Sequence, residues 1–369
     1  MVLSYSCTSI FCAELSRRHM SVKRDHEATA VKSVFVITPC PPDGLLTQGN
    51  AIAEHLRQAG VRTSLLSRAK SSWRRLLDIG LRGFFVMPFH DVALVNVYGS
   101  RAFVYESAAI LYANWWKKHS VVFIRGGWMP EFVQRWPRWT HFVFSKANLI
   151  LVPHEFLRAE LSALGLRVDG IIPNFIELEK YKFRERSRLA PHFLYLRGMH
   201  SIYNPAMAVR AFALIQQQYP DASLTMAGRE STDSDLCRAL VRDLHVSNVH
   251  FIGQVPKEQI PALADKHDIH LHTNRVENMP VSIIEMWACG LPIVGTRVGG
   301  MPYLVRHRVD GILVASENYC AMADACLELL SESELARTLS QNGRARAQEL
   351  TWESIEPAWA RALALDEDM

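Results

Sequence analysis

The chain has 369 residues, 49% of them hydrophobic and 21% charged, a composition typical of a soluble globular enzyme. This length suggests two domains rather than one core, and no apolar run reaches the ~18 residues of a membrane-spanning helix. The seven cysteines are odd in number and scattered, without a Cys-x-x-Cys pair. They argue for reduced thiols in a cytoplasmic protein and against a disulfide framework or a zinc site.

Charge is distributed unevenly, although the net charge is only +4. Residues 31–188 carry 22 Lys and Arg against 12 Asp and Glu, whereas residues 189–369 carry 15 against 22. A basic half followed by an acidic half supports a division into two domains. It also suggests that the first half meets something anionic, such as a membrane surface or a phosphate-bearing acceptor.

The chain begins with a segment that we expect to be a disordered extension, residues 1–30. Its apolar patch follows no basic region and no cleavage site is evident, so a secretory signal is not expected. Short apolar runs then alternate with helical patterns. The predicted strands of the first half are Val34–Thr38, Arg62–Leu66, Val92–Tyr98, Val121–Ile124, Leu149–Val152 and Gly170–Ile172, and the predicted helices include Gln48–Ala59, Phe103–Lys118 and Glu155–Leu164.

The second half repeats this alternation. Its predicted strands are Phe193–Leu196, Ser223–Ala227, Val249–Ile252, Ile269–Thr273, Pro292–Gly295 and Gly311–Val314. Its predicted helices are Pro205–Tyr219, Ser234–His245, Lys257–Lys266 and Pro280–Ala288, followed by long helices from Asn318 to Leu350 and an amphipathic helix from Trp352 to Leu365.

This order of elements predicts an α/β fold with two Rossmann-like, doubly wound domains, because strands that alternate with helices form parallel sheets covered on both faces. We expect an N-terminal domain over residues 31–176, a charged linker over 177–190 and a C-terminal domain over 191–350. The last segment, 351–369, is expected to carry a helix that crosses back to the first domain.

Two carboxylates eight positions apart form the most informative motif. Glu277 follows a predicted strand and a short loop, and Glu285 lies in a helix that Pro280 opens and Gly290 closes. The first N–H groups of such a helix, with its positive dipole end, favour an anion. The motif therefore predicts a site for a diphosphate whose flanking hydroxyls contact the two acids, as in a sugar nucleotide.

Residues 193–315 resemble the nucleotide-binding half of retaining GT-B glycosyltransferases of the family-4 type. The likeness is carried by Glu277–Glu285 as an E-x7-E element and by the glycine turn Thr296–Pro302. The sequence Leu196–Pro205 is similar to bacterial members that read Leu-Arg-Gly-x-His-x-Ile-Tyr-Asn-Pro. Ile172–Ile176 resembles the family's link between domains, and Val121–Pro130 resembles the loop on the first domain's side of the cleft.

The resemblance implies specific roles. Glu277 would hold a donor-sugar hydroxyl and stabilise positive charge on the reacting carbon, and Arg197 would neutralise the leaving diphosphate. Glu285 would bind the ribose hydroxyls. The other implied donor-binding residues are Met279, Val281, Ser282, Tyr203, His200 and Gly253, and those implied on the acceptor side of the cleft are Gly44, Gly49, Arg125, Gly126 and Gly127.

The sequence departs from the family pattern at three positions. Pro280 stands where many relatives have glycine, and proline lacks an N–H for the phosphate. Tyr203 is nearest to a position commonly taken by lysine, and Arg125 lies near a position commonly taken by histidine. Arg275, or Arg125 from across the cleft, is a candidate to compensate for the missing cation.

The resemblance implies transfer of a sugar from UDP or GDP to a saccharide or lipid-linked acceptor, without a metal or cofactor, in cell-surface polysaccharide or glycolipid synthesis. Two other functions remain open. A sugar-nucleotide-binding scaffold without activity agrees with the three departures. An NAD-dependent oxidoreductase requires a Gly-x-Gly-x-x-Gly turn, which the loop from Gly44 to Gly49 does not supply. Nucleic acid is not an expected partner, because no nucleic-acid-reading module is present.

Two further patterns have more than one interpretation. His270 and His272 alternate with apolar residues on one strand, which favours packing in the core over metal binding. The aromatic and basic stretches Trp73–Phe89, Trp115–Phe123 and Arg135–Phe144 agree either with peripheral contact at the inner face of a membrane or with core packing beneath a solvated basic rim.

Overall fold

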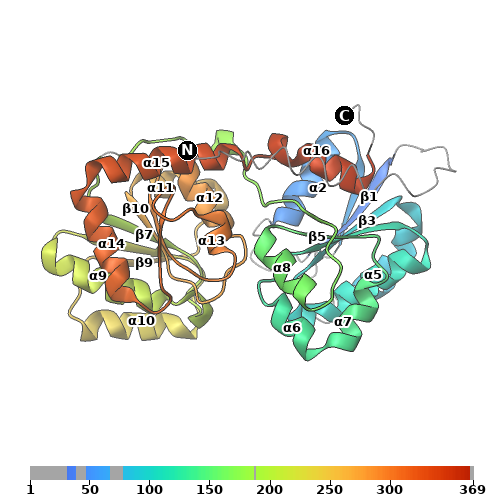
Figure 1. Cartoon of the computed structure of the whole chain (residues 1–369), viewed down its shortest axis with the longest axis horizontal. Helices are drawn as coiled ribbons and strands as arrows, with labels where there is room; N and C mark the ends of the chain where they lie inside the picture. The colour runs from blue at the N-terminus through green and yellow to red at the C-terminus, as the bar shows by residue number, and fades with distance from the viewer. Residues whose placement is uncertain (1–30, 39–46, 67–77, 187, 366–369) are drawn as a thin grey trace, which may run out of the picture.

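The computed structural model describes residues 31–38, 47–66, 78–186 and 188–365. They form two α/β domains, each built on a parallel six-stranded sheet with helices on its faces (Figure 1). This arrangement confirms the predicted fold class. The expected disordered extension, Gly44 and Trp73 lie outside the described residues.

The first sheet has the strand order β2-β1-β3-β4-β5-β6. The continuous apolar runs of β1 and β3 are buried along their whole length, as expected of parallel strands covered on both faces. The strands are β1 Ser33–Ile37, β2 Arg62–Leu66, β3 Val92–Val97, β4 His119–Ile124, β5 Leu149–Val152 and β6 Gly170–Ile171.

The helices of the first domain are α2 Gln48–Gln58, α4 Phe84–Val86, α5 Phe103–Trp115, α6 Met129–Arg135, α7 Pro137–Phe144 and α8 Glu155–Ala163. Helix α2 begins at a capping box in which the Thr47 side chain and the Asn50 side chain each accept from the other's backbone N–H. Between residues 31 and 365, as far as they are described, no helix combines the length and the apolar character needed to span a bilayer.

The second sheet has the order β12-β11-β10-β7-β8-β9. Its strands are β7 His192–Leu196, β8 Ser223–Ala227, β9 Val249–Gly253, β10 Ile269–His272, β11 Ile293–Thr296 and β12 Ile312–Val314. Its helices are α9 Pro205–Gln218, α10 Thr232–Asp243, α11 Ile260–Asp265, α12 Val281–Ala288, α13 Met301–Leu304, α14 Tyr319–Ser331 and α15 Ser333–Gln348. The single helix predicted over Lys257–Lys266 is instead a 3-10 turn, Lys257–Gln259, followed by α11, which has Pro261 in its first turn.

The last helix, α16 Trp352–Leu363, lies on the first domain although it follows the second in sequence (Figure 1). Its buried side chains Trp352, Ile355 and Trp359 belong to the same apolar cluster as Val34 and Phe123 of the first sheet. The Phe123 and Trp359 rings lie 5.3 Å apart. The helix therefore completes the core on one face of the first sheet.

The chain crosses between the domains twice, and the two crossings lie side by side. Ile176 pairs with Thr351 in an isolated parallel bridge, and the Ile176 N–H donates to the Leu350 carbonyl at 3.0 Å. Beyond the crossing, the linker is held against the second domain. The buried Arg186 guanidinium donates to the backbone carbonyls of Ala264 and His267 at 3.0 and 3.1 Å.

Candidate active site

A cavity of about 890 Å³ opens between the carboxyl-terminal edges of the two sheets, a size suited to a small ligand. The segments that line it begin at or after the carboxyl-terminal ends of strands, as is typical of ligand sites in parallel sheets. On the first domain these residues are Thr47, Gln48, Tyr98, Arg125, Pro153 and Asn174. On the second they are residues 196–200, Tyr203, 227–231, Gln254, Val255, Lys257, Ile260, 277–282 and Glu285.

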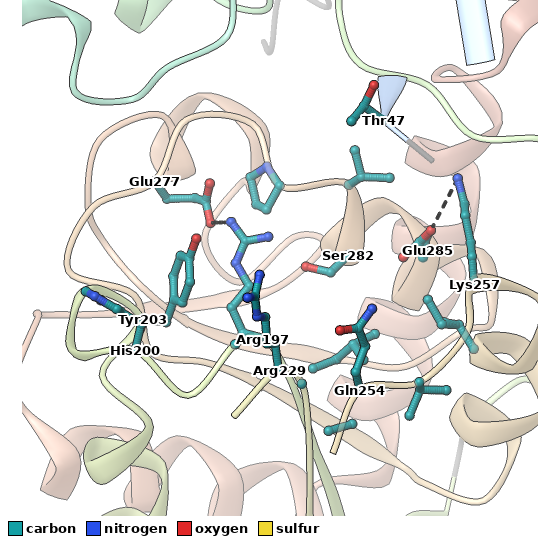
Figure 2. Close-up of a pocket in the computed structure, with 18 of the residues that line it drawn as sticks. Thr47, Arg197, His200, Tyr203, Arg229, Gln254, Lys257, Glu277, Ser282 and Glu285 are labelled. Carbon is teal, nitrogen blue, oxygen red and sulfur yellow. Dashed lines mark hydrogen bonds and ion pairs between the residues drawn. The ribbon is translucent and has the colours of Figure 1, made fainter. Parts of the chain in front are cut away.

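The Glu277 carboxylate is buried and surrounded by donors. Arg197 Nη2 lies 2.6 Å and His272 Nε2 3.2 Å from Oε2, which also accepts from the Asn274 side-chain amide. The Asn278 N–H donates to Oε1 at 3.0 Å. These contacts leave the carboxylate in one fixed position at the end of the cavity, beside Arg197 (Figure 2).

Electrostatics keep Glu277 ionised. Burial by itself raises the pKa of this carboxyl, but the Arg197 charge, the His272 hydrogen bond and the Asn278 N–H oppose it and lower the pKa to about 2. Burial also lowers the pKa of His272, so its ring is neutral near pH 7 and its Nε2–H donates to Glu277. A permanent negative charge therefore faces the cavity.

The loop that carries Glu277 is packed against the glycine turn after β11. Gly299 has φ +48°, and a Cβ there would lie 2.1 Å from the Glu277 carbonyl oxygen, so a larger residue would displace the loop. The Gly300 N–H donates to the same oxygen at 3.0 Å. On the other side, the Asn278 side chain donates to the Arg125 carbonyl of the first domain at 2.7 Å.

Helix α12 points its first turn at the cavity. Pro280 is its N-cap, so the proline ring removes no N–H from the helix itself, and Val281 and Ser282 lead the first turn. The Ser282 hydroxyl is buried and has no hydrogen-bond partner among the described residues. An unpartnered hydroxyl beside the positive end of a helix suits an oxyanion.

Glu285 lies one helical turn further along α12, toward the other end of the cavity (Figure 2). Its Oε1 accepts from the Tyr181 hydroxyl at 2.8 Å and lies 4.0 Å from Lys257 Nζ. Burial raises the pKa of Glu285, while Lys257 and Tyr181 oppose that rise without cancelling it. Glu285 thus contacts a neutral hydroxyl and a more distant cation, whereas Glu277 contacts the Arg197 cation directly.

Arg197 follows β7 and lies between Glu277 and Ser282 in the view of Figure 2. Its guanidinium carbon lies 4.8 Å from the Tyr203 ring centroid. Arg197 Nε is buried and has no partner within the described ranges. His200 also lines the cavity and uses Nδ1 to accept from the Ile202 N–H at 3.3 Å. Arg197 thus retains a free donor after pairing with Glu277.

The structure brings most of the implied residues together. Glu277, Arg197 and Glu285 line the one cavity, with Met279, Val281, Ser282, Tyr203, His200 and Arg125. Gly49, Gly126, Gly127 and Gly253 do not line it. Gly49 packs against Thr38 and Asn96, Gly126 against the Tyr98 backbone and Gly127 near Val276 and Asn278, while the Gly253 carbonyl accepts from the Gly228 N–H.

Of the two candidates to compensate for the missing cation, Arg125 lines the cavity and Arg275 is not among its lining residues. Arg275 does not supply the missing charge, because its Nε lies 2.6 Å from Glu317 and its other nitrogens bond to Ser201 and Asn204. The second-domain wall instead carries Arg229 and Lys257 in addition to Arg197 (Figure 2).

Sequence reasoning missed Lys257, Arg229 and Tyr181, because no motif spacing relates them to Glu285. It also interpreted His272 only as a packed residue. The two histidines are buried, but only His272 contacts Glu277. The signal available was that the strand alternation places His272 at the end nearest the motif.

No group of three or more His, Cys, Asp or Glu side chains is arranged as a metal site in the part of the chain that the structure describes. Asp233, in a sequence that superficially matches an Asp-x-Asp metal motif, lies in the first turn of α10 and accepts from the Ser201 N–H at 2.7 Å. This contact agrees with a structural role at the helix start.

Comparison with known proteins supplies independent information. Residues 180–346 match the profile of the family described as "Glycosyl transferases group 1". The chain is 27% identical over 207 residues to N-acetyl-alpha-D-glucosaminyl L-malate synthase of Bacillus anthracis, covering 56% of this chain and 52% of that protein. It is 29% identical over 214 residues to D-inositol 3-phosphate glycosyltransferase of Pseudarthrobacter chlorophenolicus, covering 55% and 50%. The chain thus spans about half the length of the curated relatives it matches.

Solved structures agree on the fold. The crystal structure of Anabaena Alr3699/HepE in complex with UDP and glucose superposes with a TM-score of 0.73 at 16% identity, covering 90% of this chain and 99% of that one. At this identity the likeness establishes the GT-B arrangement of two Rossmann-like domains. Residues 180–346, which match the glycosyl transferases group 1 profile, build nearly all of the second domain and supply Arg197, Glu277 and Glu285.

Proposed function

We propose that the protein transfers a sugar from a nucleoside-diphosphate sugar, with UDP or GDP as the nucleotide, to a hydroxyl of a saccharide or lipid-linked acceptor with retention of configuration. One observation carries this proposal. Two buried donors without partners among the described residues, Ser282 Oγ and Arg197 Nε, lie in the same cavity as the ionised Glu277 carboxylate. The family match over 180–346 and the names of the relatives support it.

The donor would lie along the second-domain wall. Glu285 would accept from the ribose hydroxyls, and the first turn of α12 with the Ser282 hydroxyl would bind the diphosphate. Arg197 would offer Nε and Nη1 to the leaving phosphate while Nη2 stays with Glu277. Donors fixed where negative charge develops are usually the largest contribution to catalysis.

The reaction would break the bond from the anomeric carbon to the diphosphate and form one from that carbon to the acceptor oxygen. The Glu277 charge would stabilise the positive charge on the sugar between these events. By resemblance to the family, the departing diphosphate oxygen accepts the acceptor's proton on the same face. The chain would then need no carboxylate nucleophile and no metal.

Thermal shift with UDP, GDP and their sugars identifies the nucleotide first, because a ligand that binds only the folded chain raises the melting temperature. The preferred donor is then incubated with saccharide and lipid-linked acceptors, and release of nucleoside diphosphate is measured. Proton NMR of the product reports the anomeric configuration. Nucleotide binding without transfer to any acceptor would favour the non-catalytic scaffold, and an inverted product would exclude the retaining mechanism.

We also propose peripheral contact of the first domain with an anionic membrane surface, which would give access to a lipid-linked acceptor. Phe85 and Trp115 are largely exposed, at 66% and 71%, and Phe84 joins this surface by contacting both the Phe85 and the Trp116 rings. The adjacent Lys117 and Lys118 complement anionic headgroups. Exposed aromatic side chains beside basic ones are typical of interfacial contact.

Sedimentation with vesicles tests this contact. Vesicles that contain phosphatidylserine should bind the wild-type chain, and Phe85→Ser with Trp115→Ser should reduce binding. Ile252→Ser, which removes an exposed apolar side chain of the second domain, is the control. Equal binding to neutral vesicles, or no binding at all, would contradict the proposal.

A further inference from the structure

Arg125 carries a charge that the proposed reaction leaves unused. It follows β4 and lines the first-domain side of the cavity. Burial lowers the pKa of Arg125 to about 10, so the guanidinium remains charged near pH 7. Among the residues that the structure describes, no carboxylate pairs with it. A half-buried cation without a counter-charge is costly, and an anionic ligand would offset that cost.

The guanidinium is held in a fixed orientation. Nε donates to the Asn96 amide oxygen and Nη1 to the Asn174 amide oxygen, both at 2.7 Å. Each of these amides is itself fixed, because its nitrogen donates to a backbone carbonyl at 3.2 and 2.7 Å respectively. The Phe123 ring lies 4.1 Å from the guanidinium carbon. All of these partners are uncharged, so they orient the charge without neutralising it.

The opposite wall differs in this respect. There Arg197 is paired with Glu277 at 2.6 Å, and Arg229 and Lys257 line the same wall. Together with the start of α12, that wall supplies its own donors for a diphosphate. Arg125 instead extends from the first domain, on the side of the cavity where the proposed reaction would place the acceptor. Its planar fork matches a carboxylate or phosphate group.

We propose that Arg125 forms an anion subsite that recognises an acidic group on one of the two sugars, distinct from the donor diphosphate. The acidic group is either the carboxylate of a uronic-acid donor or a carboxylate or phosphate on the acceptor. This inference rests on the proposed glycosyl transfer, and it narrows the substrates to pairs in which at least one sugar is acidic. Asn96 and Asn174 act as positioning residues that orient the guanidinium.

Matched substrate pairs test the subsite on the full chain. UDP-glucose and UDP-glucuronic acid, or their GDP counterparts, differ only at C6, and inositol and inositol phosphate differ by one anionic phosphate group. Calorimetry gives the affinity for each donor and for free UDP or GDP, and initial rates give KM for each acceptor. The variants are Arg125→Gln and Arg125→Lys, with Arg101→Gln, an exposed arginine of the same domain, as the control.

Arg125→Gln should weaken the binding of the acidic member of one pair on the order of 10- to 100-fold, because a hydrogen-bonded charge is lost. The affinity for free UDP or GDP and for the neutral member should stay unchanged. Arg125→Lys should recover part of the loss, since it restores the charge but not the fork. An effect confined to the donor pair identifies a uronic-acid donor, and an effect confined to the acceptor pair identifies an acidic acceptor.

Two results would overturn the inference. If Arg125→Gln weakens the binding of free UDP or GDP equally, Arg125 contacts the diphosphate. If it weakens the binding of acidic and neutral members equally, Arg125 does not recognise the acidic group. If Arg125→Gln melts well below the wild type, the Arg125→Lys data decide. If Arg125→Gln handles the acidic and the neutral member of both pairs as well as the wild type does, the subsite alone is refuted, whereas a wild-type chain that binds no nucleotide sugar would refute the proposed function.

Discussion

The two acids of the cavity lie on one loop and helix, eight residues apart, yet their surroundings have opposite effects. Glu277 touches the Arg197 cation and has its pKa lowered to about 2, whereas Glu285 touches the Tyr181 hydroxyl and has its pKa raised. Both carboxyls are buried, so burial does not cause the difference. A charged partner at hydrogen-bond distance outweighs desolvation, and a neutral partner with a more distant cation does not.

In the proposed reaction, the two ends of the cavity would have different roles. The Glu277 end holds a permanent charge in a rigid cage of donors, which suits stabilisation of a transition state. The Glu285 end holds a carboxyl whose charge depends on pH and on the linker residue Tyr181, which suits ground-state recognition of the nucleotide. Four substitutions test this difference between the two ends of the cavity.

Glu277→Gln should have the largest effect. The amide keeps the shape of the side chain but removes the charge, and we expect turnover to fall about 10³-fold.

The lowered pKa also means that Glu277 stabilises the fold above its unfolded pKa of ~4.3, a contribution lost as the pH falls toward about 2. The measurements are nucleotide release and thermal melts between pH 2.5 and 7, where the variant should lose this acid dependence. Glu334→Gln, an exposed acid of α15, is the control, and full turnover by Glu277→Gln would remove this carboxylate from the chemistry.

Arg197→Ala should reduce kcat about 10²-fold and raise the donor KM less, because the leaving group gains its charge late in the reaction. It should also raise the pKa of Glu277 by removing the nearest cation. Steady-state kinetics over a range of donor concentrations separate the two parameters. An unchanged kcat with only a raised KM would place Arg197 in ground-state binding.

Glu285→Gln should act mainly on donor binding and raise the donor KM about tenfold, since hydrogen bonds to a charged group are lost. The raised pKa adds a pH signature. In the wild type, the donor KM should rise as the pH falls through the pKa of Glu285, because the protonated carboxyl accepts hydrogen bonds less well. Profiles of KM against pH should show this acid limb in the wild type and not in Glu285→Gln. The same limb in both proteins would mean that another group titrates.

Tyr181→Phe should have the smallest effect, about threefold on the donor KM, the usual size of one lost hydrogen bond. The Tyr181 hydroxyl favours the ionised carboxylate, so its loss should move the acid limb of KM to higher pH. Tyr219→Phe, far from the cavity on α9's end, is the matched control. A shift to lower pH would contradict the role of Tyr181 as a donor to Glu285.

Much of the fold was predictable because short strand-like segments alternate with helical patterns along the whole chain. Arg62–Leu66, Leu149–Val152 and Ser223–Ala227 were predicted with the bounds that the structure shows. The spacing of Glu277 and Glu285 singled out two acids that line the cavity, and Pro280 and Gly290 marked the ends of the helix that carries Glu285. These signals are local or repeat at a fixed period, so they can be recognised in a single sequence without a structure.

The partners of the acids were not predictable in the same way. Tyr181 reaches Glu285 across 104 residues, from a linker without strand or helix periodicity. Lys257 comes from a 3-10 turn that the sequence presents as the start of a longer helix. Arg275 is a cation two residues before Glu277 in the sequence, but its guanidinium forms an ion pair with Glu317. Such contacts depend on the tertiary fold, which a single sequence does not spell out.

The position of α16 has a consequence for biosynthesis. The strands of the first domain leave the ribosome early, but Trp352, Ile355 and Trp359, which cover one face of that sheet, are translated only after the whole second domain. One apolar face of the first domain's sheet therefore stays exposed to solvent until α16 has been translated. We therefore expect truncation after Leu350 to unfold the first domain, which loses the cover of α16, and to leave the second domain folded.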